Sequence, residues 1–225
     1  MQPRSAEERR EALVELYQEA RGCTRCPLHQ GRTKVVFGAG HADADLMFVG
    51  EAPGQQEDIQ GLPFVGRAGK LLDQLLGEVG LERADVFITN VLKSRPPGNR
   101  DPQLEEIEAC KPYLHSQVEL IEPRVICTLG NFATKLLTRS QRGITSVHGR
   151  PQVHELGGRA VRVFPIYHPA AALRSTKTLE ELREDFTRLP ALLEEPPPVP
   201  VGAVAPVAAV AAEPAPEPPQ INLFD

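Results

Sequence analysis

Short apolar runs and helical repeats alternate along most of the chain. Apolar runs typical of buried strands occupy residues 46–50, 86–91, 124–130 and 160–167. Apolar residues that return every three or four positions predict helices at about 66–79, 102–121, 131–137 and 179–193. Strands that alternate with helices predict an α/β protein with a mainly parallel sheet, covered by helices on both faces.

Two local signals extend this outline. Ser5 and Glu8 have the spacing of a capping box, and apolar residues follow them at helical intervals. This pattern predicts an amphipathic N-terminal helix that ends near Gly22. Between two β-rich stretches, the pair Gly157-Gly158 has the sequence of a tight turn. We therefore expect a β-hairpin that leads into the last strand.

The composition is that of a globular protein. Of the 225 residues, 41% are hydrophobic and 24% are charged, which is enough for one substantial core. No stretch approaches ~18 uninterrupted apolar residues, and the first residues lack the apolar segment of a secretory signal. We therefore expect a cytoplasmic protein without a membrane span.

The chain changes character at Glu194. Residues 194–219 contain nine prolines and no aromatic residue, and such a segment cannot bury enough surface to offset its ordering entropy. The chain then ends in Gln220-Ile221-Asn222-Leu223-Phe224-Asp225, with an apolar pair. We predict a folded domain over 1–193, a disordered linker over 194–219 and a partner-binding peptide over 220–225.

The charge is distributed unevenly. Five of the 30 acidic residues lie from Glu194 onward, where there is no Lys or Arg. The remaining 25 acidic residues are balanced by 25 basic ones. The net charge of -5 is therefore no argument against a nucleic acid partner, which responds to local patches.

Polar residues follow three of the predicted strands. The first strand leads into Gly50-Glu51-Ala52-Pro53-Gly54, the second ends at Asn90, and the late strand is followed by His168. Ligands of open α/β sheets bind outside the carboxyl ends of the strands. Each feature alone is more typical of a turn or a cap, but together they predict a site at one sheet edge.

Two loops near these strands carry further candidates. Phe64 lies in a Gly-rich loop before a helix, where an aromatic ring is either a core residue or a stacking platform for a base. Lys93, Arg95 and Arg100 lie in a loop rich in Pro and Gly. This loop is either a solvated turn or a contact for nucleic acid phosphates.

The chain has four cysteines, which are Cys23, Cys26, Cys110 and Cys127. Cys23 and Cys26 form a CxxC motif, whose short spacer lets two thiolates bind one centre. Four cysteines without a spare suggest a single site with four thiolates, although a buried apolar cysteine is the alternative for Cys127. The spacing leaves zinc and iron–sulfur both open, and a thioredoxin-like motif would lack its preceding strand.

At this point the sequence motifs are recognisable. The segments GEAPGQQED, PFVGRAGKLLD, ITNVLKSRPPGNRDP and YHPAAALR, in this order and together with the four cysteines, closely resemble family 4 uracil-DNA glycosylases. The resemblance spans about residues 23–189. It implies a three-layer α/β/α sandwich, an enzyme that removes uracil from DNA, and a structural 4Fe-4S cluster on all four cysteines.

The resemblance also implies roles for individual residues. Phe64 is expected to stack on the extruded uracil, Asn90 to read its O4 and N3-H edge, and His168 to donate a hydrogen bond to O2. Activation of water is open between Glu51 and the backbone near Ala52, because an Ala side chain cannot polarise water. Pro53 is expected to line the same pocket.

Other expectations concern DNA and a partner protein. Leu173 is a candidate wedge for the vacated base stack, and Lys93, Arg95 and Arg174 are candidates for the DNA backbone. The C-terminal QINLF is similar to the peptide with which bacterial proteins bind the replicative sliding clamp. Its recognition residues are then Gln220, Leu223 and Phe224. We expect a monomer that is associated with the nucleoid.

Three alternatives stay open at the level of the sequence. An enzyme of the same superfamily that becomes trapped covalently on uracil-DNA would need a nucleophilic His, and residues 139–143 contain none. A second alternative is a non-catalytic iron–sulfur scaffold that binds DNA at the clamp. The third concerns the cysteines alone, which would bind zinc.

Overall fold

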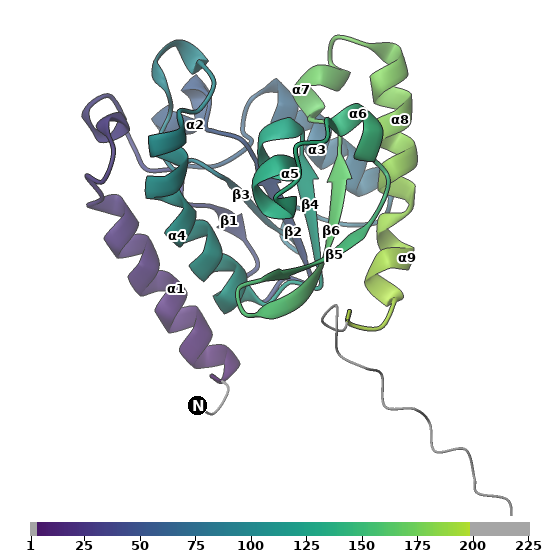
Figure 1. The fold of residues 1–225 in the computed structure, drawn as a ribbon, viewed down its shortest axis with the longest axis horizontal. Coiled ribbons are helices and arrows are strands. Elements are labelled where there is room, and N and C mark those ends of the chain that lie inside the picture. The colour runs from purple at the N-terminus through teal and green to yellow at the C-terminus, as the bar shows by residue number, and fades with distance from the viewer. Residues whose placement is uncertain (1–3, 199–225) are drawn as a thin grey trace, which may run out of the picture.

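The computed structural model describes residues 4–198, and these form one α/β domain (Figure 1). Its sheet has six strands in the order β1-β3-β2-β4-β6-β5. The four central strands are parallel, and the short β1 and the hairpin strand β5 pair antiparallel at the two edges. The strands are β1 Ala39–Gly40, β2 Leu46–Gly50, β3 Phe87–Asn90, β4 Val125–Leu129, β5 Gln152–Leu156 and β6 Arg159–Ile166.

Helices cover both faces of this sheet, which confirms the expected α/β architecture (Figure 1). The helices are α1 Ala6–Arg21, α2 Gln55–Gln60, α3 Arg67–Glu78, α4 Leu104–Ile121, α5 Asn131–Thr138, α6 Ile144–Val147, α7 Pro169–Ala172, α8 Thr176–Thr187 and α9 Leu189–Glu194. Short 3-10 turns occur at Pro27–Gln30 and Pro97–Asn99. None of the helices within residues 4–198 has the length and apolar character needed to cross a bilayer.

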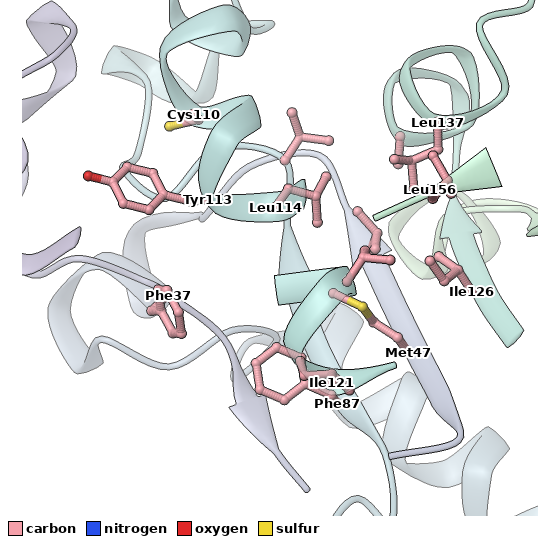
Figure 2. Packing of buried hydrophobic residues seen from close by; sticks show 14 of the residues in the cluster. Phe37, Met47, Phe87, Cys110, Tyr113, Leu114, Ile121, Ile126, Leu137 and Leu156 are labelled. Carbon is pink, nitrogen blue, oxygen red and sulfur yellow. The ribbon is translucent and has the colours of Figure 1, made fainter. Parts of the chain in front are cut away.

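The core consists of two clusters, one on each face of the sheet. Side chains of α1, α4 and α5 pack on one face, and side chains of α3, α8 and α9 pack on the other. Successive residues of a strand point to opposite faces. Met47 and Ile126 therefore belong to the α4 face, in the same cluster as Leu114, and all three are drawn in Figure 2. Phe48 and Cys127 belong to the α3 face.

The local signals at the N-terminus and in the hairpin are confirmed. Ser5 caps α1 through a reciprocal capping box with Glu8, and the helix ends at Arg21 with Gly22 as its C-cap. Gly157 and Gly158 both have positive φ and connect β5 to β6. Positive φ at both central residues is what a two-residue hairpin turn requires.

The C-terminal helix differs from the prediction. The helix expected over 179–193 is two helices, α8 and α9, and Pro190 lies in the first turn of α9. Proline lacks the N–H that a continuous helix would need, so it starts a new helix instead. The sequence pattern also missed the short helices α2, α6 and α7 and the edge strand β1. Elements of so few residues are too short to show a helical or alternating repeat of apolar positions.

The boundary of the folded domain lies a few residues beyond the predicted one. Helix α9 continues to Glu194, and Arg124 donates a hydrogen bond to the carbonyl oxygen of Glu195 at 2.6 Å. Arg162 donates to the carbonyl oxygen of Pro196 at 2.9 Å. Residues 194–196 are therefore attached to the domain. The rest of the predicted linker, from 199 on, and the peptide over 220–225 lie outside the described residues.

Candidate active site

A cavity of about 540 Å³ opens at the carboxyl ends of the parallel strands. It brings together the loops that follow β2, β3 and β6, as expected for an open α/β sheet. The residues predicted for the site that line it are Glu51, Ala52, Pro53, Phe64, Asn90, His168 and Arg174. Other lining residues are Gly54, Glu57, Ala68, Pro96, Asn99, Arg100, Asp101, Ala170 and Ala171.

Asn90 forms the inner wall of the cavity. It is the last residue of β3, pairs in register with Gly50 of β2 and is 2% exposed. Its Oδ1 atom is buried and has no hydrogen-bond partner within the described residues. A buried amide oxygen without a partner is costly unless a ligand supplies a donor. A side chain at Gly50 would collide with this oxygen and with the Phe64 ring, so the glycine keeps the cavity open.

Phe64 is held in an unusual backbone conformation. Its φ of 51° lies in the left-handed region, which a bulky residue rarely adopts without support. Arg83 supplies that support by donating hydrogen bonds to the carbonyl oxygens of Pro63 and Phe64. On the other side of the loop, Glu57 accepts the backbone N–H groups of Val65 and Gly66, both at 3.0 Å.

His168 stands opposite Phe64, and the centres of the two rings are 5.6 Å apart. The residue caps α7, because its Nδ1 accepts a hydrogen bond from the backbone N–H of Ala170 at 3.0 Å. Burial lowers the pKa of His168 to about 4. The imidazole is therefore neutral at pH 7, and with Nδ1 as an acceptor its proton lies on Nε2.

Glu51 is the carboxylate of the cavity. Burial, with a smaller contribution from the negative charge of Asp101, raises the pKa of Glu51 to about 7. Near neutral pH the group therefore exists in both protonation states. A carboxylate with such a pKa is suited to accept a proton from a water molecule. Ala52 and Pro53, which follow it, line the same wall.

The residues predicted to meet the DNA backbone have different surroundings. Arg174 lines the mouth of the cavity, and Leu173 beside it is 41% exposed. Arg95 is partly buried and donates to the Asn99 side chain at 2.7 Å. The prediction that Lys93 contacts the DNA backbone is wrong, because Lys93 is 2% exposed and lies inside the protein.

The buried ammonium of Lys93 has an internal role. It donates to the Thr89 hydroxyl at 2.7 Å, to the Asn90 carbonyl oxygen at 2.8 Å and to the Gln117 side chain at 2.6 Å. Burial lowers the pKa of Lys93 to about 7. A charge-assisted hydrogen bond to its carbonyl fixes the backbone of Asn90. Lys93 therefore holds the backbone at Asn90 in place from inside the protein, and it cannot reach a DNA phosphate.

Sequence reasoning did not assign two positioning residues, Glu57 and Arg83. Glu57 lies inside the GEAPGQQED segment, and its place in that motif could have identified it. Arg83 lies in the turn before β3, where a lone Arg has no distinguishing pattern. Only the tertiary structure brings it to the loop that carries Phe64.

The four cysteines do not come together. Cys23, Cys26 and Cys110 belong to the cluster on the α4 face, where the Tyr113 hydroxyl lies near Cys23. Cys127 is fully buried in the cluster on the α3 face. The predicted set of four thiolates therefore does not fit this fold, because the sheet separates Cys127 from the other three. Among residues 4–198, no three His, Cys, Asp or Glu side chains meet closely enough to bind a single metal ion.

The residues predicted to bind a sliding clamp, Gln220, Leu223 and Phe224, lie outside the part of the chain that the structure describes. The prediction of a clamp-binding peptide therefore rests on the sequence alone.

Comparisons with known proteins identify the family of this chain. Residues 37–189 match the model of the uracil DNA glycosylase superfamily. The chain is 47% identical over 184 residues to a type-4 uracil-DNA glycosylase of Sulfurisphaera tokodaii, covering 80% of this chain and 84% of the relative. Identity is 46% over 183 residues to the type-4 enzyme of Archaeoglobus fulgidus, covering 80% and 92%. For the type-4 enzyme of Thermotoga maritima it is 48% over 168 residues, covering 74% and 86%. The chain therefore belongs to the uracil DNA glycosylase superfamily, among the relatives of its type-4 enzymes.

Proposed function

We propose that this protein is a monofunctional uracil-DNA glycosylase, which hydrolyses the N-glycosidic bond of deoxyuridine, releases uracil and leaves an abasic site. The observation that carries the proposal is the convergence of Glu51, Phe64, Asn90 and His168 in one cavity. The C1' atom of a stacked nucleotide cannot be reached inside a duplex. The enzyme therefore acts on an extruded nucleotide, whose extrusion costs a few kcal/mol and least for mispairs or single strands.

Asn90 supports selection of uracil over cytosine. Its buried Oδ1 lacks a donor, and uracil offers one at N3-H, while the amide NH₂ can donate to O4. Cytosine presents an acceptor at N3 and a donor at N4, so the same amide would face like groups. A buried polar group left without a partner costs about 1–3 kcal/mol, which penalises the wrong base. The Phe64 ring supplies a stacking surface against the base.

His168 supports cleavage of the bond. Negative charge grows on uracil O2 as the glycosidic bond breaks. A neutral imidazole whose Nδ1 is held by Ala170 presents Nε2–H as a fixed donor for that charge. Preorganised donors of this kind are worth about 3–4 kcal/mol of transition-state stabilisation.

Glu51 supports the attack of water. In its ionised form it can accept a proton from a water molecule that adds to the positively charged sugar. A weak base is sufficient at a carbon that already has oxocarbenium character. The protein's own groups thus account for base recognition, stabilisation of the leaving group and activation of water.

The test uses labelled oligonucleotides that contain a single uracil in single-stranded, U·G or U·A contexts. We expect free uracil and an alkali-labile abasic site, with a large loss of product for Asn90→Ala and His168→Ala. DNA binding without product would favour the scaffold alternative. A labelled band that stays on the denatured protein would favour the covalent alternative. Either result would overturn the proposal.

The C-terminal peptide is a separate part of the proposal, supported by its similarity to clamp-binding peptides and by the Pro-rich segment that precedes it. We infer that Gln220, Leu223 and Phe224 dock in the pocket of the replicative clamp, which would place the enzyme at the nucleoid. Purified clamp should bind the full chain and lose affinity for a Leu223→Ala, Phe224→Ala variant. Equal binding of both proteins would refute this part alone.

A further inference from the structure

Three of the four cysteines are gathered beside one segment of α4. The loop that carries Cys23 and Cys26 rests on this helix, because the Arg25 guanidinium lies 5.0 Å from the centre of the Tyr113 ring. The Tyr113 hydroxyl lies near Cys23 and donates a hydrogen bond to Glu19 Oε1 at 3.3 Å. Cys110 precedes Tyr113 by three residues, so both side chains leave α4 on the same side. Figure 2 shows the Cys110 sulfur and the Tyr113 ring pointing the same way, away from the sheet.

Ser94 is a buried hydroxyl residue directly after a backbone segment that approaches Cys110. The backbone of Lys93 lies close to the Cys110 thiol, and the Lys93 ammonium donates to Gln117, two turns further along α4. These contacts hold the chain that follows β3 against the side of α4 that carries Cys110. Ser94 follows Lys93 directly and is only 4% exposed. A buried hydroxyl residue therefore lies one position along the chain from the backbone that approaches Cys110.

The carboxylate of Glu106, one turn before Cys110, is already engaged. Arg100 donates to both of its oxygens, at 2.5 and 2.9 Å, and the backbone N–H of Gln103 donates at 2.8 Å. Its side chain is fully buried in this arrangement. A carboxylate that is committed to an Arg fork and a helix cap is not free to replace a thiolate. Ser94 is therefore the better candidate for a fourth ligand.

We propose that Cys23, Cys26 and Cys110 bind an iron–sulfur cluster in this chain with the Ser94 oxygen as the fourth ligand, and that Cys127 is a core residue. A cluster spreads its irons over several ångströms, so it can join side chains that do not meet at a single ion. Oxygen is a harder ligand than thiolate and suits the iron of a cluster less well. The iron that faces Ser94 is therefore bound more weakly than the other three.

The test measures iron and acid-labile sulfide in anaerobically purified full-length protein, with the visible absorption band as a second readout. Cys127→Val should keep the cluster content of the unchanged protein, and Cys110→Ala should lose most of it. A chelator should remove the first iron at least about tenfold more slowly from Ser94→Cys than from the unchanged protein. Ser94→Ala should lose it faster.

Three results would overturn the proposal. The first is an unchanged protein that contains no iron. The second is loss of iron in Cys127→Val while its thermal unfolding is unchanged. If that variant fails to fold, Cys127→Ala provides the same comparison. The third is equal rates of iron removal from the unchanged protein and from Ser94→Cys. None of these readouts depends on glycosylase activity.

Discussion

Two residues of the cavity have pKa values that move in opposite directions. Burial disfavours the charged form of each, so it raises the pKa of Glu51 and lowers that of His168. At neutral pH His168 is an uncharged donor, and Glu51 is divided between acid and base. In the proposed mechanism, the same physical cause thus prepares two side chains for two different steps of one reaction.

This difference predicts the pH profile of the enzyme. The working form needs an ionised Glu51, whose pKa is about 7, and a neutral His168, whose pKa is about 4. We expect kcat/KM to rise from about pH 6 to about pH 8 and then to level off. Glu51→Gln should lower the rate and flatten the rise, while Glu15→Gln, on the exposed side of α1, should leave the profile unchanged. A rise that persists in Glu51→Gln would assign the titration to another group.

Gly50 is expected to be essential for access of the base. In Gly50→Ala the new methyl group would overlap Asn90 Oδ1 and approach Phe64 Cζ to 2.7 Å. We expect kcat/KM for uracil-DNA to fall at least about tenfold, because sub-ångström shifts of positioned groups are costly. Gly77→Ala is the matched control, since a methyl group there meets no atom within 4 Å. A fall of equal size in both variants would contradict the steric explanation.

At the scale of elements, the site depends on a loop fixed from two sides. Helix α2 supplies Glu57, the turn before β3 supplies Arg83, and both bind backbone groups of the loop over 61–66. The helix α3 that follows passes close to this loop, because a side chain at Gly69 would collide with the Phe64 carbonyl. Packing of short elements therefore maintains the strained φ of Phe64.

Removal of one of these contacts should loosen the stacking platform. In Arg83→Ala the carbonyl oxygens of Pro63 and Phe64 lose their donor. We expect KM for uracil-DNA to rise by about tenfold with a smaller change in kcat, because the stacking surface must then be ordered on binding. Glu15→Gln, on the exposed side of α1, is the control. An unchanged KM in Arg83→Ala would exclude this positioning role.

At the scale of the molecule, the two ends of the domain are tied to the sheet differently. α1 packs on α4, whereas the last described residues are held by Arg124 and Arg162 near the strand ends. Arg162 is 8% exposed and also pairs with the Glu195 carboxylate at 3.0 Å. Without these acceptors, the buried guanidinium would lose hydrogen bonds that water cannot fully replace.

Two truncated proteins test this boundary. A chain that ends at residue 198 should keep the thermal stability of the full chain. A chain that ends at 193 removes the partners of both Arg residues, and we expect a loss of about 1–3 kcal/mol, which corresponds to roughly 2–4 °C in Tm per kcal/mol for a domain of this size. Calorimetry measures both. Equal Tm values would place the boundary of the domain at 193.

The sequence by itself predicted every strand except the short β1, the long helices before residue 176 and the main residues of the cavity. Strands alternating with helices leave a parallel sheet as the simplest solution, and the carboxyl ends of its strands then share one edge. Asn90 and His168 were predictable for this reason, since each lies at or just beyond the carboxyl end of a strand. The capping box at Ser5 was equally visible, because all of its partners lie within one turn.

Only the tertiary structure decided which helices pack on each face of the sheet. The alternation of side chains along β4 places Cys127 on the same face as Val125 and Leu129. The sequence of the strand does not show which helices cover that face. The separation of Cys127 from Cys110 and the burial of Lys93 follow from the packing of α4 and α3 on opposite sides. Local patterns fix the elements because they act within a few residues. The partners of a side chain depend on contacts between segments far apart in the chain, which no local pattern contains.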